Sequence, residues 1–339
     1  MKKTVAVIFG GRGYESDVSI KSAEHVIENL DKRRFTTLPV FIDTDGAFKI
    51  IEPRLAHHGA KSAPEAYPVY LDGESGFLVL DRVIPVRLAI LALHGNFGED
   101  GVVQGALECA KIKTLGQSVL TSALTNDKAA TKTVADKLKI KNAEWILLTN
   151  QSASLAEKEM RPKLDYPIFL KAASFGSSYG SFKVENREEF LAHYEKIRNM
   201  GETRIIAEEL IVCDYELECA FIELSEEHFF PCGIIHSKGR FYSPEEKYKS
   251  DSSFTPSLEE APKSVKEAAI RISRELKNAL EVRYLARFDF FVSGTDIIFN
   301  EVNTFPGMTA TSLYPKIIEE KLCPFTDALT ALIERAERW

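Results

Sequence analysis

Short apolar runs that alternate with glycine turns and helical spacing dominate the first third of the chain. Residues 4–9 form a β-branched run that ends at two glycines, and the next segment, 19–30, places its apolar residues at helical intervals. Two more strand-like runs follow at 35–42 and 89–94, and the second leads through a glycine turn into a helix at about 100–111. This repeated order of strand, turn and helix predicts a parallel α/β sheet with ligand loops at the carboxyl ends of its strands.

Strands outnumber helices beyond about residue 120. Short apolar runs predict strands at 145–148, 167–171, 205–208, 216–222, 229–235, 286–292 and 296–302. Helical spacing predicts helices at 127–138, 187–200 and 325–338. The last helix repeats apolar residues along one side, which predicts a buried face formed by Phe325, Leu329, Leu332 and Ile333.

The chain divides into three predicted lobes of mixed α/β structure. Its length of 339 residues suits two or three domains of roughly 100–200 residues each. The changes in pattern place the limits of the lobes near 1–120, 121–210 and 211–339. Residues 45–87 are less regular than the strands on either side, and a hairpin is expected around Asp72 and Gly73.

Composition and charge are those of a folded chain that binds neither nucleic acid nor membrane. Hydrophobic residues make up 45% and charged residues 27% of the chain, and 43 Lys and Arg against 50 Asp and Glu give a net charge of −7. The sequence holds no Lys/Arg-rich tract, no signal-peptide core and no stretch near the roughly 20 apolar residues of a membrane span. Five cysteines without a Cys-x-x-Cys pair disfavour a zinc site and a disulfide framework, so we expect a cytoplasmic protein.

A predicted hairpin near the C-terminus carries the most informative polar pattern. A three-residue loop at 294–296 places Asp289 opposite Glu301 and, in the same register, Arg287 opposite Asn303. Strand alternation puts these four side chains on one face, with opposed Cβ atoms about 4.5–5.5 Å apart. Two carboxylates and an amide oxygen so placed suit Mg²⁺ that carries a nucleotide phosphate. A solvated polar face in which the arginine neutralises the carboxylates is an equally good interpretation, because a one-residue change of register removes the pairing.

A strand, a lysine and a glycine–serine loop follow one another at 166–180. Such a loop can cover phosphates with backbone N–H groups and hydroxyl donors, with Lys171 as a point charge. The spacing is not that of a Walker A loop, and a surface turn explains it equally well. Lys128 and Lys247, taken singly, are typical of solvated lysines.

Other polar groups lie where predicted strands end. The glycines at 10–13 follow the first strand, but their spacing does not fit Gly-x-Gly-x-x-Gly, which disfavours NAD binding. His94 ends another strand and suits a structural role as well as a substrate contact. Glu208, Glu209 and Glu216 surround a strand end, where carboxylates could accept hydrogen bonds from a ribose or an adenine amino group.

Taken together, these motifs resemble the D-alanine–D-alanine ligase family of the ATP-grasp superfamily over nearly the whole chain. In order, the motifs are Gly10-Gly11 with Glu15 and Ser19, His94 through Gly105, Asp127-Lys128, Lys171 through Gly180, Glu246-Lys247-Tyr248, Arg287 with Asp289, and Asn300 through Pro315. The resemblance implies an α/β (α+β) ATP-grasp fold. Its parts would be an N-terminal Rossmann-like parallel α/β domain (1–120), a small central domain (121–210) and a C-terminal catalytic domain with a mixed sheet (211–339).

The resemblance also implies roles for single residues. The ATP-binding set would be Lys128, Lys171, Gly176, Ser178, Glu208, Glu209, Leu210, Ile211, Glu216, Lys247 and Asn300. Two Mg²⁺ or Mn²⁺ ions would be held by Asp289, Glu301 and Asn303. The catalytic residues would be Glu15, Ser177, Tyr248, Arg287 and Gly307. The substrate contacts would be His94, Ser312 and Leu313.

The implied activity is ATP-dependent ligation of two D-alanine molecules through an acyl phosphate, for peptidoglycan precursors. Tyr248 in the predicted lid is similar to lids of ligases that use D-alanine or D-serine as second substrate, so a D-alanine–D-serine ligase is the alternative. A non-catalytic nucleotide-binding protein of the same fold is a third hypothesis. The implied partners are the small molecules D-alanine and ATP, and a homodimer is the expected assembly.

Overall fold

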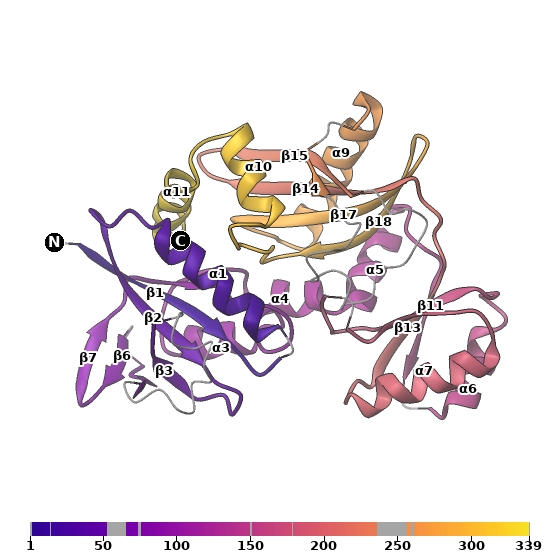
Figure 1. Ribbon diagram of the computed structural model, residues 1–339, viewed down its shortest axis with the longest axis horizontal. Helices are drawn as coiled ribbons and strands as arrows, with labels where there is room; N and C mark the ends of the chain where they lie inside the picture. The colour runs from indigo at the N-terminus through magenta and orange to yellow at the C-terminus, as the bar shows by residue number, and fades with distance from the viewer. Residues whose placement is uncertain are drawn as a thin grey trace.

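A computed structural model describes most of the chain (Figure 1). The described residues are 2–13, 15–52, 66–73, 76–149, 151–177, 179–235, 256–258 and 261–338. Within them, helices and strands gather into an N-terminal, a central and a C-terminal group, each built on a sheet of its own (Figure 1).

The N-terminal sheet has a parallel centre and an antiparallel edge. Its strands, in spatial order, are β4 (Tyr67–Pro68), β3 (Phe48–Ile50), β2 (Phe35–Ile42), β1 (Lys3–Gly10), β8 (Leu88–Leu91) and β9 (Thr114–Leu115). β1 runs parallel to β2 and β8, and β8 runs parallel to β9. Helices α1 (Ser16–Glu28) and α3 (Val102–Cys109) supply the crossover connections that parallel pairs require. The predicted parallel α/β sheet is therefore confirmed.

A small antiparallel sheet forms within the less regular segment 45–87. It consists of β5 (Tyr70–Leu71), β6 (Gly76–Val79) and β7 (Arg82–Pro85). Leu71 pairs with Phe77, so the hairpin expected around Asp72 and Gly73 is confirmed. Phe77 is fully buried and belongs to the same core cluster as Ile8 of β1, so this sheet packs against the N-terminal sheet.

The central sheet is antiparallel along its described strands. In spatial order these are β10 (Trp145–Thr149), β13 (Arg204–Glu209), β11 (Ile168–Ala172) and β12 (Ser181–Val184). Helices α6 (Ala153–Met160) and α7 (Arg187–Asn199) contribute Met160, Phe190 and Tyr194 to the core on one face. Because strand residues alternate, Lys171 and Glu208 lie on the opposite face.

The C-terminal sheet is built from long antiparallel strands. In spatial order they are β16 (Pro256–Ser257), β15 (Glu227–Ile235), β14 (Tyr215–Glu223), β17 (Leu285–Ser293) and β18 (Asp296–Asn303). A single parallel bridge between Asn142 and Phe299 makes the sheet mixed at the β18 edge. Helix α9 (Lys263–Ala279) packs on this sheet through Val265, Ala269 and Leu276. The sequence-based prediction missed α9, although these apolar residues recur at helical spacing.

Two consecutive helices link the N-terminal and central groups. They are α4 (Val119–Asn126) and α5 (Lys128–Lys137). Asp127 caps α5, because its side chain accepts the N–H of Ala130 at 2.8 Å. Two bonds from the guanidinium of Arg204, at 2.6 and 3.2 Å, hold the cap in place. The predicted helix at 127–138 is confirmed, and its first residue, Lys128, is thereby fixed in space.

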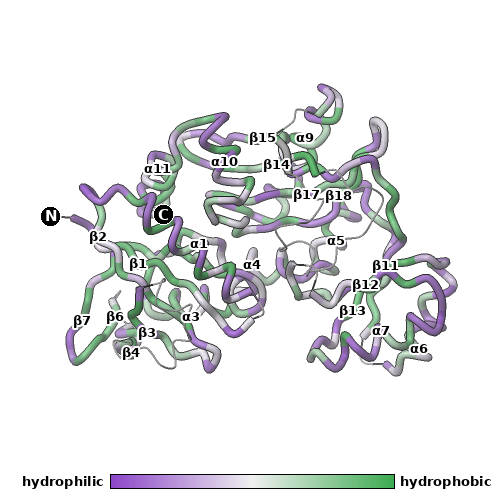
Figure 2. Tube along the Cα trace, in the orientation of Figure 1, coloured by the Kyte–Doolittle hydropathy of each residue, from purple (hydrophilic) through white to green (hydrophobic). Residues whose placement is uncertain are grey.

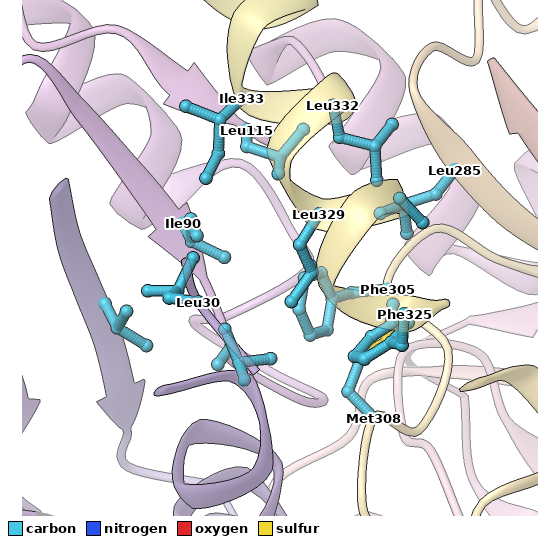
Figure 3. Close-up of a cluster of buried hydrophobic side chains, with 14 of the residues drawn as sticks. Leu30, Ile90, Leu115, Leu285, Phe305, Met308, Phe325, Leu329, Leu332 and Ile333 are labelled. Atoms are coloured by element: carbon cyan, nitrogen blue, oxygen red, sulfur yellow. The ribbon is translucent and has the colours of Figure 1, made fainter. Parts of the chain in front are cut away.

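The C-terminal helix returns to the N-terminal sheet. Helices α10 (Leu313–Lys321) and α11 (Phe325–Arg338) end the chain, and α11 alternates between hydrophilic and hydrophobic positions, whereas β1 is mostly hydrophobic (Figure 2). The predicted buried face of α11 is confirmed, since Leu329 and Ile333 are almost fully buried beside Ile90 of β8 and Leu115 of β9 (Figure 3). Residues from both ends of the chain thus share one core, and the three lobe limits stay a prediction.

Candidate active site

A cleft of about 870 Å³ lies where the three groups of elements meet. It is lined by every predicted site residue that the structure describes: Glu15, His94, Lys128, Lys171, Gly176, Ser177, Glu208, Glu209, Leu210, Ile211, Glu216, Arg287, Asp289, Asn300, Glu301, Asn303, Gly307, Ser312 and Leu313. The other predicted residues, Ser178, Lys247 and Tyr248, lie outside the described residues.

The hairpin of β17 and β18 forms one wall of the cleft. Asp289 pairs with Glu301, and Arg287 pairs with Asn303, as the sequence predicts. Phe288 of the same hairpin is fully buried in the core beneath the sheet, so the predicted division into a polar and an apolar face is also confirmed. Two carboxylates therefore stand side by side in the cleft.

The turn of this hairpin differs from the prediction. The predicted three-residue loop at 294–296 is wrong, because Ser293 pairs with Asp296 and leaves a two-residue turn. Gly294 takes a φ of +59°, which suits the first central position of a tight hairpin turn. A β-bulge then inserts Asn300 as an extra residue. The shorter turn shifts the register by one residue and the bulge shifts it back, so the predicted pairs form for a partly different reason.

Arg287 is held by carboxylates on both sides. Its Nε and Nη2 atoms donate to the two carboxylate oxygens of Asp289 at 2.7 Å each, and Nε lies 3.4 Å from Oε1 of Glu218. Burial alone would lower the pKa of Arg287, but Asp289 and Glu218 outweigh it and hold that pKa well above its usual value. The arginine thus neutralises Asp289, as the alternative interpretation expects, but inside a cleft and not on a solvated face.

Oxygen atoms on this wall fit a hard divalent cation. Asp289 and Glu301 face each other across the hairpin, and Asn303 donates from Nδ2 to Asp289 at 2.9 Å. Carboxylate and amide oxygens are the donors that Mg²⁺ prefers, usually together with substrate phosphates and water. No group of three or more His, Cys, Asp or Glu side chains able to hold a metal occurs among the described residues, so an ion here would also need the amide oxygen and ligand oxygens.

Two lysines line the same cleft. Lys128 donates from Nζ to the carbonyl of Phe175 at 2.7 Å and lies 3.7 Å from Oε2 of Glu301. Lys171 forms an ion pair with Glu208. Burial opposes the charge on Lys171, but Glu208 outweighs it, and the pKa of the lysine is raised. The charged form of Lys171 is therefore favoured, and both lysines line the cleft together with the carboxylate hairpin.

The glycine–serine loop closes on Glu15, at the start of α1. The hydroxyl of Ser177 donates to the carboxylate of Glu15. Gly95 and Gly176 approach that carboxylate so closely that a Cβ on either would overlap it. Burial raises the pKa of Glu15, while Ser177 and Lys128 lower it. The loop of the central group thus meets the N-terminal group at this one carboxylate.

Glu99 and His94 line the cleft beside Glu15. The carboxylate of Glu99 accepts the N–H of Gly95 at 2.8 Å and that of Phe305 at 3.3 Å, which ties the loop after β8 to the loop after β18. Burial, followed by the charge of Glu15, raises the pKa of Glu99 to about 8. Burial, followed by the charge of Arg287, lowers the pKa of His94 to about 4, so its imidazole is neutral.

The residues expected to contact adenine and the second substrate also line the cleft. Glu209 accepts the N–H of Glu144 at 2.9 Å, whereas Glu208 turns inward to the lysines. Oγ of Ser312 accepts the N–H of Thr309 at 3.1 Å, and Ser312 precedes helix α10. The N-terminus of a helix suits an anionic group such as a carboxylate.

Sequence reasoning missed three polar residues that line this cleft or pair with a residue that lines it. Glu218 follows Glu216 at the alternate position of β14 and pairs with Asp289, so strand alternation could have found it. Lys132 lies four residues after Lys128 on α5, which is one helical turn. Glu99 lies within the His94–Gly105 motif, but spacing could not predict its bond to Phe305, which joins two loops that are distant in sequence.

These features together define a class of protein. A central antiparallel sheet that carries Lys171, a neighbouring helix that begins at Lys128, a C-terminal sheet with facing carboxylates and a shared cleft are the parts of an ATP-grasp ligase. Comparison with known proteins gives the particular family. The family models described as "D-ala D-ala ligase N-terminus" and "D-ala D-ala ligase C-terminus" match residues 4–117 and 134–334. The chain belongs to the D-alanine–D-alanine ligase family, whose members are ATP-dependent ligases.

Individual relatives agree along their whole length. The D-alanine–D-alanine ligase of Solibacter usitatus is 35% identical to this chain, and the match covers 99% of this chain and 96% of that ligase. The structure of VanG D-Ala:D-Ser ligase from Enterococcus faecalis has a TM-score of 0.86 at 29% identity, covering 99% of this chain and 100% of that one. The D-alanine–D-alanine ligase from Bacillus anthracis complexed with ATP has a TM-score of 0.72 at 26% identity, covering 99% and 98%.

Family membership has consequences for ligands. ATP and a divalent metal are used by this family, and the ATP-grasp fold is confirmed by the structural neighbours.

In the described part of the chain we find no helix with the length and apolar character that crossing a membrane requires.

Proposed function

We propose that the protein uses ATP to join two D-alanine molecules into D-alanyl-D-alanine for peptidoglycan precursors. The observation that carries this proposal is one cleft that holds Lys128, Lys171, the Asp289–Glu301 pair and Arg287. A protein that only bound a magnesium nucleotide would need the lysines and the paired carboxylates, but not the buried arginine and the Glu15 pocket.

The proposed reaction has two steps. A carboxylate is a poor electrophile, so a carboxylate oxygen of the first D-alanine attacks the γ-phosphorus of ATP, and ADP leaves. Lys128 and Lys171 neutralise charge on the transferring phosphoryl group. The amine of the second D-alanine then attacks the acyl carbon, and phosphate leaves after the tetrahedral oxyanion collapses. Arg287 and the N–H of Gly307 stabilise that oxyanion, where losing one donor typically costs about 10²–10³ in rate.

The substrate positions follow from the residues that line the cleft. Glu15, bonded to Ser177, binds the amine of the first D-alanine, and neutral His94 lines the same pocket. Ser312 and Leu313 bind the carboxylate of the second D-alanine at the start of α10.

The proposed ATP contacts come from α5, β11, β13, β14 and β18 and from the loops beside them. The described members of the set are Lys128, Lys171, Gly176, Glu208, Glu209, Leu210, Ile211, Glu216 and Asn300. Ser178, Lys247 and Tyr248 join the proposal from their sequence motifs alone. Asp289, Glu301 and Asn303 would hold two ions, Mg²⁺ or Mn²⁺, which supply Lewis-acid stabilisation of phosphate charge when bound.

A D-alanine–D-serine ligase is the second candidate, favoured by the similarity to VanG D-Ala:D-Ser ligase. The two candidates share every residue named above and differ in the second substrate.

We also propose that the enzyme is a cytoplasmic homodimer, as expected for the family.

A coupled assay tests the proposal. Purified protein is incubated with ATP, Mg²⁺ and D-alanine, and ADP and dipeptide are followed together. We expect ADP release that depends on D-alanine and matches dipeptide in amount. ADP release without D-alanine would contradict the proposal. D-serine in competition decides between the two candidates, because the D-serine ligase would show the higher kcat/KM for D-serine.

A further inference from the structure

Helix α5 carries two lysines on one side, one helical turn apart. Lys128 reaches the cleft, and its side chain is 17% exposed. Lys132 is 3% exposed and does not line the cleft. A buried ammonium is costly unless it is paired, so Lys132 needs a partner close by.

That partner is Glu208. Nζ of Lys132 lies 3.0 Å from Oε2 of Glu208, while the other carboxylate oxygen pairs with Lys171. Nζ of Lys132 also donates to Oδ1 of Asn142 at 3.4 Å. Glu208 is 4% exposed, so one buried carboxylate stands between two ammonium groups.

The charges of this triad do not cancel. Burial alone would raise the pKa of Glu208, but Lys132 and Lys171 outweigh it and lower that pKa to about 2. One carboxylate and two lysines carry formal charges that sum to +1. Lys171 is the lysine of the triad that lines the cleft, so this surplus charge lies beside the space proposed for ATP phosphates.

Without Lys132 the surplus positive charge of the triad would be lost. Glu208 would pair with Lys171 alone, and a one-to-one ion pair would draw the ammonium toward the sheet and cancel its charge. A phosphate would then compete with Glu208 for the same ammonium group.

We infer that Lys132 is a positioning residue, which shares the charge of Glu208 so that Lys171 stays available to the nucleotide phosphates. This inference rests on the proposed nucleotide site of the enzyme, and it assigns a role to a side chain outside the cleft. It requires that Lys132 act through Glu208, and this requirement separates it from a general contribution to stability.

A double-mutant cycle on the full chain tests the inference. The variants are Lys132→Met, Glu208→Gln and both together, and the measurement is the Kd of ADP and of adenosine, which lacks phosphates. We expect Lys132→Met to weaken ADP about tenfold while adenosine changes little. In the Glu208→Gln background, where the competing carboxylate is absent, Lys132→Met should change the Kd of ADP by less than about twofold.

Two further variants serve as controls. Lys137→Met removes the same charge from an exposed position on the same helix and should leave the Kd of ADP within about twofold. Lys132→Arg keeps the charge and should retain ADP affinity. If Lys132→Met does not fold, Lys132→Gln replaces it in the cycle.

The opposite results would overturn the inference. Equal loss of ADP and adenosine affinity would mean that Lys132 only supports the fold. An equal loss of ADP affinity from Lys132→Met in wild type and in the Glu208→Gln background would mean that Lys132 does not act through Glu208. An unchanged Kd of ADP in Lys132→Met would exclude any role. Because no D-alanine is present, these outcomes are separate from the coupled assay of wild-type enzyme, which alone tests the ligase activity.

Discussion

Three carboxylates in the cleft are each held by a different neighbour, and their chemistry differs accordingly. Ser177 donates to Glu15, Lys128 lies near Glu301, and backbone N–H groups hold Glu99. Because all three are glutamates, residue type alone would predict the same protonation for each of them. The sequence could therefore predict which residues are acidic and near strand ends, but the protonation of Glu99 depends on burial and on a neighbour 84 positions away, Glu15.

Glu99 should make the stability of the protein depend on pH. Its pKa of about 8 lies above the ordinary value of 4.5, so the folded state keeps a proton that the unfolded state releases. The stabilising contribution of the protonated form is complete below pH 4.5 and is lost as the pH rises through about 8. The free energy of unfolding of wild type, measured in urea relative to Glu99→Gln, should fall over this range. A difference that is constant with pH would show that Glu99 is ionised throughout.

At the scale of elements, the β17–β18 hairpin shows how a sequence prediction can be right in its result and incomplete in its cause. Strand alternation fixed which residues of 285–293 face the core, because Phe288 and Phe290 are both buried. The lengths of a turn and the presence of a bulge are not encoded by alternation, so the position of Asn300 had to come from the structure.

The hairpin carboxylates should be needed for turnover but not for folding. Asp289→Asn and Glu301→Gln remove charge on the cleft face, where several kcal/mol of phosphate stabilisation is expected from a bound metal. Each should lower kcat at least about 10²-fold. Asp296→Asn at the exposed turn, where Asp296 pairs with Lys141 at 2.7 Å, is the matched control and should keep kcat. Retained kcat in both cleft variants, with folded protein by circular dichroism, would refute the metal assignment.

Helix α11 provides a second prediction at this scale. Leu329 is 2% exposed in the core shared by the two ends of the chain (Figure 3). Leu329→Ala should lower the free energy of unfolding by about 2–5 kcal/mol, because it leaves a cavity in a packed core. Arg338→Ala, at an exposed position of the same helix, should change it by less than about 0.5 kcal/mol. Urea unfolding of both variants measures the difference, and equal effects would argue against the shared core.

For the whole molecule, the cleft exists because three sheets that fold from separate stretches of chain converge on one space. Individual motifs such as Lys171 with its loop, or Asp289 with Glu301, could be read from the sequence as candidate sites with open alternatives. Their convergence could not be read from spacing, because it depends on contacts such as that between Glu15 and Ser177, which lie 162 positions apart. Only the resemblance to a known family connected them beforehand.

The central claim is that this cleft activates a carboxylate of D-alanine by phosphorylation before the peptide bond forms. D-alanine labelled with ¹⁸O in its carboxylate tests the claim most directly, because the attacking oxygen stays on phosphorus when phosphate leaves. With ATP and Mg²⁺, mass spectrometry of the released phosphate should find one ¹⁸O atom for each dipeptide formed. Dipeptide formed with phosphate free of ¹⁸O would contradict the account.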